Sequence, residues 1–160
     1  MNCLETQNLY SSESYISRIS QTFDAIRFKQ NVILLGDVCS GKSSAIKILQ
    51  MLNTDGKTEN VTVINPILFS SQQLYGFMDS KYKLWKDGII TRELRKCLEG
   101  CVDNWIVFDG PIEPSWVESL YSVLEERRTI TLGSGELLKN HGCNIFLFEV
   151  TDLKHASPTL

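Results

Sequence analysis

The stretch GDVCSGKSS, residues 36–44, decides the fold class of this 160-residue chain. It matches the pattern G-x-x-x-x-G-K-[ST], in which backbone N–H groups and a lysine side chain surround phosphate groups. The glycines let the backbone curl toward the phosphates, and the hydroxyl of the serine after the lysine is a ligand for Mg²⁺. The predicted nucleotide contacts in this loop are Gly36, Asp37, Val38, Cys39, Ser40, Gly41, Lys42, Ser43 and Ser44.

The segments on either side of the loop have the patterns that a phosphate-binding loop needs. The apolar run NVILLG at residues 31–36 precedes it and is typical of a buried strand. The run SSAIKILQML at residues 43–52 follows it with helical spacing, and the N-terminus of such a helix adds its dipole to the site. The alternative is an ordinary strand–turn–helix that binds no ligand. The order strand, loop, helix favours nucleotide binding.

The rest of the chain alternates between helical and strand patterns. Residues 129–139 alternate around Gly133-Ser134-Gly135, which predicts a hairpin, and residues 67–87 indicate irregular structure with a short helix or hairpin. Helices are predicted at 13–28, 43–52, 88–100 and 114–128, and buried strands at 31–36, 61–65, 105–110 and 144–150. This alternation predicts one α/β domain over residues 13–160, with a mainly parallel sheet flanked by helices, after a flexible segment at residues 1–12.

The strand predicted at 105–110 carries an acidic residue near its end. Asp109 is expected to hold a metal ion together with the hydroxyl of Ser43, so these two residues are the predicted Mg²⁺ ligands. The alternative is a carboxylate that caps the turn before Pro111.

The position after Asp109 bears on hydrolysis. It is Gly110, which has no side chain to orient an attacking water. Nothing in the spacing of Glu113 and Glu118 places either carboxylate over a γ-phosphate. The sequence therefore predicts a site that binds ATP or ADP, with Mg²⁺, without a catalytic residue for hydrolysis.

Composition and charge exclude several classes of function. The net charge of −3 leaves no broad basic surface, so nucleic acid is not an expected partner. No apolar run approaches the roughly 20 residues that span a bilayer, and the first residues lack the pattern of a signal peptide, so no membrane partner is expected. The five cysteines include no C-x-x-C pair, which favours reduced thiols in the cytosol over disulfides or zinc.

Several further runs of the sequence are distinctive. They are INP (64–66), LYG (74–76), LWKDG (84–88), WIVFDGPIEPSWVESLYSVLEE (105–126), SGELL (134–138) and FEVTDLKHASP (148–158). Together they resemble a dynein heavy chain, and most of all the second AAA+ module of its motor ring. The likeness extends from about residue 15 to residue 158.

The resemblance implies the large subdomain of an AAA+ P-loop NTPase within a microtubule motor. The second module of such a ring is generally regarded as binding ATP without hydrolysing it, in agreement with the argument from Gly110. By similarity, Asp109 is the Walker-B residue and the sensor-one position falls between Glu149 and Asp152. The Walker-A residues by similarity are Gly36, Gly41, Lys42 and Ser43. The implied partners are neighbouring AAA+ modules, and microtubules only through the parent chain, in the cytoplasm with the cytoskeleton or in a cilium.

The chain also departs from the family pattern. Asp37 stands where the family often has proline, and Tyr121 where it usually has asparagine. The resemblance implies that the chain stops before the fifth strand and the helical lid of an AAA+ module. Since that strand flanks the P-loop strand, residues 31–35 are expected to form an exposed apolar edge, which invites pairing with another chain.

Two other interpretations remain open. A free-standing P-loop NTPase or phosphotransferase would need a basic lid or an arginine cluster to neutralise the transferred phosphate. The sequence offers Arg92 and Arg95 at the spacing of a helix face and Arg127 and Arg128 at a helix end, with no evident lid. The third interpretation is a truncated gene product with no biochemical role of its own.

Overall fold

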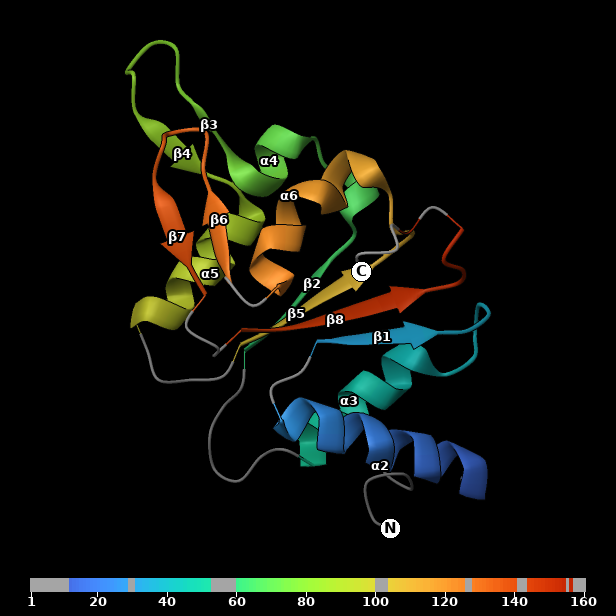
Figure 1. The fold of residues 1–160 in the computed structure, drawn as a ribbon. Helices are drawn as coiled ribbons and strands as arrows, with labels where there is room; N and C mark the ends of the chain where they lie inside the picture. Colours follow the sequence, from blue (N-terminus) through green and yellow to red (C-terminus); the bar gives the residue numbers. More distant parts are fainter. Residues whose placement is uncertain are drawn as a thin grey trace.

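The central layer of the molecule, in the residues that the structure describes, is a parallel sheet of four strands in the order β1–β8–β5–β2. Figure 1 shows these strands side by side. The computed structural model describes residues 12–28, 31–52, 60–99, 104–125, 128–140, 144–154 and 156. The strands are β1 (Val32–Leu35), β2 (Asn60–Ile64), β5 (Asn104–Asp109) and β8 (Asn144–Val150). The predicted α/β fold with a mainly parallel sheet is confirmed. The prediction of buried strands holds for β5 and β8 but is wrong for β1 and β2, which end the described sheet and leave Leu35 and Val63 exposed.

Helices cover both faces of this sheet (Figure 1). On one face lie α2 (Glu13–Arg27) and α3 (Lys42–Leu52). On the other lie α4 (Ser71–Tyr75), α5 (Ile89–Glu99) and α6 (Pro114–Leu124). Each of the four predicted helices is present.

Alternate residues of the central strands supply two hydrophobic cores. In β5, Trp105 and Val107 pack with residues of α2 and α3, whereas Ile106 and Phe108 pack with residues of α5 and α6. The side chains of β8 divide in the same way, and all of them are buried. Because both faces of these strands are covered, their sequences are continuous apolar runs rather than alternating ones.

Two short hairpins stand beside the helices of the second face. The segment predicted as irregular contains η1 (Pro66–Leu68), α4, and a hairpin of β3 (Gly76–Met78) and β4 (Trp85–Asp87). The hairpin predicted at 129–139 is formed by β6 (Thr129–Thr131) and β7 (Leu137–Lys139). Both expectations are confirmed.

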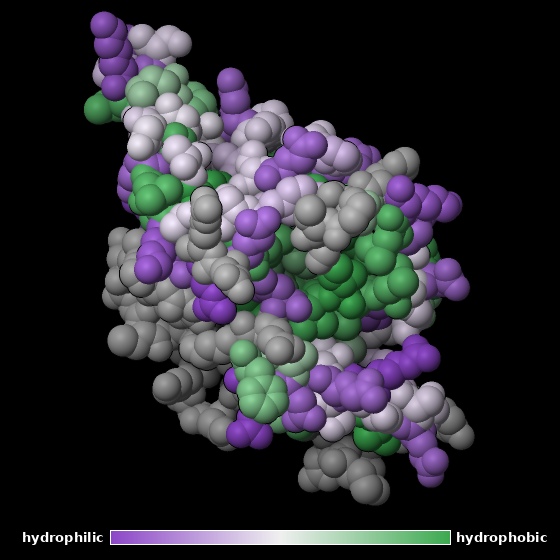
Figure 2. All heavy atoms as spheres, viewed as in Figure 1, coloured by the Kyte–Doolittle hydropathy of each residue, from purple (hydrophilic) through white to green (hydrophobic). Residues whose placement is uncertain are grey.

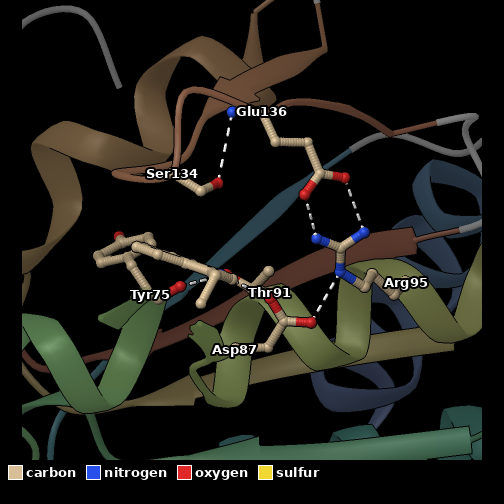
Figure 3. Close-up of polar contacts among 7 residues, drawn as sticks. Tyr75, Asp87, Thr91, Arg95, Ser134 and Glu136 are labelled. Atoms are coloured by element: carbon tan, nitrogen blue, oxygen red, sulfur yellow. Dashed lines mark hydrogen bonds and ion pairs between the residues drawn. The ribbon is translucent and has the colours of Figure 1, made fainter. Parts of the chain in front are cut away.

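Arg95 joins the two hairpins to α5. Its guanidinium donates to Asp87 Oδ2 at 2.7 Å and makes two hydrogen bonds to the Glu136 carboxylate, at 2.8 and 2.6 Å. Figure 3 shows the side chain of Arg95 extended between these two carboxylates. The bidentate hydrogen bond lowers the pKa of Glu136 below its ordinary value and raises that of Arg95. Arg95 therefore holds the two hairpins against α5 on the second face of the sheet.

Strand β1 forms one edge of the described sheet, since the order of strands begins with it. Its first three side chains are half-buried, while Leu35 is 56% exposed. Figure 2 shows hydrophobic side chains gathered on this side of the molecule, over the region where Figure 1 draws β1 and the end of β8. Within the described residues, β1 is therefore an apolar edge strand, as expected for residues 31–35. Of its apolar side chains, only that of Leu35 is strongly exposed.

Some expectations fall outside the described residues. They concern the segment predicted as flexible, except Ser12, as well as Arg127 and the last four residues. The domain boundaries at residues 13 and 160 stay predictions. In the described part of the chain, no helix is both long and apolar enough to cross a bilayer.

The Arg95–Glu136 pair predicts a pH-dependent contribution to stability. Because the pKa of Glu136 is lowered by folding, its contribution is present above the ordinary value of 4.5 and is lost as the pH falls through the lowered value. We therefore expect Glu136→Gln to reduce the free energy of unfolding at about pH 7 and to matter less at about pH 3. Urea unfolding at both pH values measures this. Glu118→Gln, at an exposed site on α6, is the matched control, and an equal loss from Glu136→Gln at both pH values would contradict the prediction.

Candidate functional site

The loop between β1 and α3 has the backbone that its glycines predict. The N–H of Gly36 donates to the carbonyl of Val150 at 3.1 Å, which attaches the start of the loop to the end of β8. Cys39 and Gly41 both have positive φ angles, 62° and 88°, so two residues of the loop adopt a left-handed backbone conformation before α3 begins at Lys42. The first N–H groups of a helix have no partner within the helix, and they are available to a ligand.

The loop borders a pocket of about 340 Å³. The pocket lies where β5 and β8 end and α3 begins, the edge of a parallel sheet at which ligands bind in α/β folds. Its lining residues are Val38, Cys39, Ser40, Gly41, Lys42, Ser43 and Ser44, then Asp109, Gly110 and Pro111, and finally Glu149, Val150 and Thr151. Seven of the nine predicted loop residues, and Asp109, are therefore brought together.

Gly36 and Asp37 are the two predicted loop residues that do not line this pocket. Their carbonyls instead accept hydrogen bonds from the Lys42 ammonium, at 2.7 and 2.8 Å. The partial negative charges of these two carbonyl oxygens stabilise the Lys42 ammonium. A phosphate in the pocket would compete with these two carbonyls for the same ammonium group.

Ser43 and Asp109, the predicted metal ligands, both line the pocket but are not bonded to each other. The Ser43 hydroxyl donates to Glu149 Oε2 at 2.6 Å. Glu149 is only 6% exposed, whereas Asp109 is exposed, and among the described residues none is hydrogen-bonded to the Asp109 carboxylate. The pocket thus has one carboxylate bonded to Ser43 and another open to a ligand.

Glu149 is the site residue that sequence reasoning left within a range instead of naming. Its strand, NIFLFEV, contains a single acidic residue in an otherwise apolar run, and that was the signal available in the sequence. In the sheet Glu149 pairs in register with Asp109, so their side chains leave adjacent strands on the same side. Val150 and Thr151, from the range considered for the sensor position, also line the pocket, but Asp152 does not.

The turn after Asp109 brings no third carboxylate to the pocket. The N–H of Gly110 donates to the carbonyl of Glu149 at 3.2 Å, which holds the turn against β8. Glu113 and Glu118 do not line the pocket, as their positions at and beyond the start of α6 indicated.

Tyr15, on the first turn of α2, contacts the loop from the face of the sheet that α2 shares with α3. Its hydroxyl donates to the carbonyl of Gly41 at 3.0 Å, and burial raises the pKa of this tyrosine. A Cβ placed on Gly41 would lie 3.3 Å from the Tyr15 ring. Sequence reasoning missed this contact because its partners are 26 residues apart and no local spacing reveals it.

The parallel sheet, the loop that follows its edge strand and the acid that ends β5 define the large subdomain of a P-loop NTPase. The family model described as AAA domain (dynein-related subfamily) matches residues 31–149. The chain belongs to this family of AAA domains.

Similar proteins are dynein heavy chains. The chain is 40% identical to "Cytoplasmic dynein 2 heavy chain 1" of Caenorhabditis elegans over 91% of its length, and 37% identical to "Dynein heavy chain, cytoplasmic" of Eremothecium gossypii over 96%. It is 34% identical over 97% of its length to "Dynein-1-beta heavy chain, flagellar inner arm I1 complex" of Chlamydomonas reinhardtii. The chain spans about 4% of the length of each of these relatives.

The contact between Tyr15 and the loop predicts a specific cost of adding a methyl group at Gly41. Gly41 and Gly135 have nearly equal φ angles, 88° and 86°, but a Cβ on Gly135 would meet nothing within 4 Å. We expect each alanine substitution to lower the free energy of unfolding by about 1–2 kcal/mol through its φ angle. Gly41→Ala should lose about 1 kcal/mol more through crowding against the Tyr15 ring. Equal losses in denaturant unfolding would contradict the account of this contact.

Proposed function

We propose that this domain binds ATP or ADP as a complex with Mg²⁺ and does not hydrolyse it, and that its role is structural and allosteric within a dynein heavy chain. The observation that carries the proposal is the pocket itself. Its loop backbone and Lys42 suit phosphates, while the position after Asp109 is a glycine. The runs quoted from the sequence support the second AAA+ module as the position of this domain in a motor ring.

The residues present fit a nucleotide and its metal ion. A volume of about 340 Å³ is within the range of small-molecule sites. Gly36 has no Cβ to approach Ser40 Oγ, which would lie 2.8 Å away, so the loop can remain tightly curled. The hydroxyl of Ser43 and the carboxylate of Asp109 are oxygen ligands of the kind that Mg²⁺ prefers. Bound Mg²⁺ would neutralise charge on the β- and γ-phosphates.

The carboxylates that line the pocket are the reason to expect no hydrolysis. Among the described residues these are Asp109 and Glu149. Asp109 is proposed as a metal ligand, and Glu149 accepts the hydroxyl of Ser43, which places it on the same side as the metal ligands. Asp109 is thus committed to the metal ion, Glu149 lies on the side of the metal ligands, and Gly110 supplies no carboxylate at the position after Asp109, so neither acid is placed to orient a water for attack.

The partners and location of the domain follow from the proposed parent. We propose neighbouring AAA+ modules of the same ring as its direct partners, with microtubules reached only through the parent chain. The relatives include chains named cytoplasmic and flagellar, so a cytoplasmic or a ciliary motor is consistent with the comparisons. A bound nucleotide would fix the relative positions of neighbouring modules.

A free-standing phosphotransferase is the weaker candidate. It needs an arginine beside the transferred phosphate, and in the described residues no arginine lines the pocket. Arg95 instead bonds to Asp87 and Glu136 on the other side of the molecule. The helix-face spacing of Arg92 and Arg95 therefore does not mark a phosphate site.

Lys42→Ala tests the proposed function. Removing the ammonium should weaken ATP binding by at least about tenfold, because a charge-assisted hydrogen bond to phosphate is lost. Calorimetric titration with Mg²⁺–ATP measures binding, and a phosphate assay on the same sample measures turnover. Lys47→Ala, at an exposed position of the same helix, is the matched control. Unchanged affinity in Lys42→Ala would refute the proposed site, and Lys42-dependent turnover would favour the free-standing enzyme. A folded chain that binds no nucleotide would favour a product without a biochemical role.

Gly110→Glu tests the reason given for the absence of hydrolysis. Gly110 has a φ angle of 157°, so any side chain here adds backbone strain, and its Cβ would lie 3.3 Å from Asn65 Oδ1, which has to move by a few tenths of an ångström. We expect the variant to release phosphate from ATP slowly, and Lys42→Ala in the same chain to abolish that release. Gly110→Gln has the same shape without the charge and should remain inactive. Turnover in the glutamine variant equal to that in the glutamate variant would contradict the argument.

A further inference from the structure

The hydrogen bond between Ser43 and Glu149 connects two residues of the pocket lining that are 106 positions apart in the chain. It joins the first turn of α3 to the end of β8, and its length of 2.6 Å is that of a charge-assisted O–H···O⁻ bond. Glu149 is nine-tenths buried, unlike Asp109 beside it. The most buried carboxylate of the pocket therefore lies against the hydroxyl proposed to hold the metal ion.

The charged side chains that line the pocket are two carboxylates and one ammonium. Asp109 and Glu149 lie at paired positions of neighbouring strands, and Lys42 lies across from them on the loop. The ammonium donates hydrogen bonds to two loop carbonyls. A triphosphate that enters without a cation brings several negative charges close to both carboxylates. Like charges a few ångströms apart repel, and the repulsion is stronger where the protein excludes water.

We propose that Glu149 makes this pocket selective for metal-complexed nucleotide, so that it takes Mg²⁺–nucleotide and rejects the free polyphosphate. This inference rests on the proposed function. When a cation is present, the Ser43 hydroxyl turns from Glu149 to the metal and the carboxylate faces positive charge. When no cation is present, the carboxylate faces the phosphates and opposes their binding. Glu149 contributes more to this selectivity than Asp109, because solvent and salt screen a buried charge less than an exposed one.

The test compares ATP binding with Mg²⁺ and with EDTA in the wild-type chain and in Glu149→Gln. The selectivity is the ratio of the two dissociation constants. We expect Glu149→Gln to reduce this ratio about tenfold or more, mainly by tightening the binding of uncomplexed ATP, since neutralising one carboxylate removes a repulsion of that size. Glu149→Asp keeps the charge and should keep the ratio. Glu118→Gln, which changes an exposed carboxylate outside the pocket, should leave both constants unchanged.

The outcomes distinguish this inference from the proposed function. An unchanged ratio in Glu149→Gln, with binding that still depends on Lys42, overturns the role of Glu149 and leaves the proposed function intact. Failure of the wild-type chain to bind ATP in either condition overturns both. Thermal unfolding without nucleotide checks that the variants fold. Should Glu149→Gln not unfold cooperatively, Glu149→Ala replaces it: a ratio reduced about tenfold supports the role of Glu149 and an unchanged ratio overturns it.

Discussion

The parallel pairing of β8 with both β1 and β5 is the constraint on which the rest of this domain depends. It places the carboxyl ends of three strands at one edge of the sheet, so the P-loop, Asp109 and Glu149 meet there. The same pairing buries β8 on both faces, where its alternate side chains enter the two cores. The packing energy of the cores therefore also positions the pocket. A change of register of one residue would reverse the side chains of the strand and move Glu149 away from Ser43.

Three polar groups of the loop already have partners within the chain. Lys42 bonds to loop carbonyls, Ser43 to Glu149, and the Gly41 carbonyl to Tyr15. Each such hydrogen bond has a net value of about 1 kcal/mol, so a ligand that offers charged phosphates and a cation can replace those of Lys42 and Ser43. The loop is thus held in shape before a nucleotide arrives, and the bonds that hold it are weak enough to exchange. Tyr15 can keep its bond, because it does not line the pocket.

The parts of the fold that could be predicted are those that leave a local pattern. The strands around Val107 and Leu147 are apolar runs because both faces are buried, and the hairpin at Gly133 follows from its turn residues. The phosphate-binding loop is equally local, since its pattern lies within nine residues. The sequence did not predict that the carbonyls of Gly36 and Asp37 bond to Lys42 or that these two residues lie outside the pocket lining. Both depend on the conformation of the Lys42 side chain, which no sequence pattern records.

The remaining features arise from contacts between distant segments. The role of Glu149 depends on its register with Asp109 and on its distance from Ser43, neither of which spacing along the chain records. Arg95 has the spacing of an exposed helix face, yet it bonds to carboxylates on two separate hairpins. In each case a charged residue acquires its partner only when the sheet is assembled. Sequence patterns identified the charges, and only the fold could show their partners.

A crystal structure of the chain grown with ATP and Mg²⁺ tests the central claim most directly. The account predicts an intact triphosphate in the pocket after prolonged incubation, with the Lys42 ammonium moved from the carbonyls of Gly36 and Asp37 to a phosphate. It also predicts that Ser43 has left Glu149 for the metal ion. A pocket that contains ADP formed from the added ATP would contradict the absence of hydrolysis. A pocket without nucleotide, and with Lys42 still bonded to the loop, would contradict the assignment of the site.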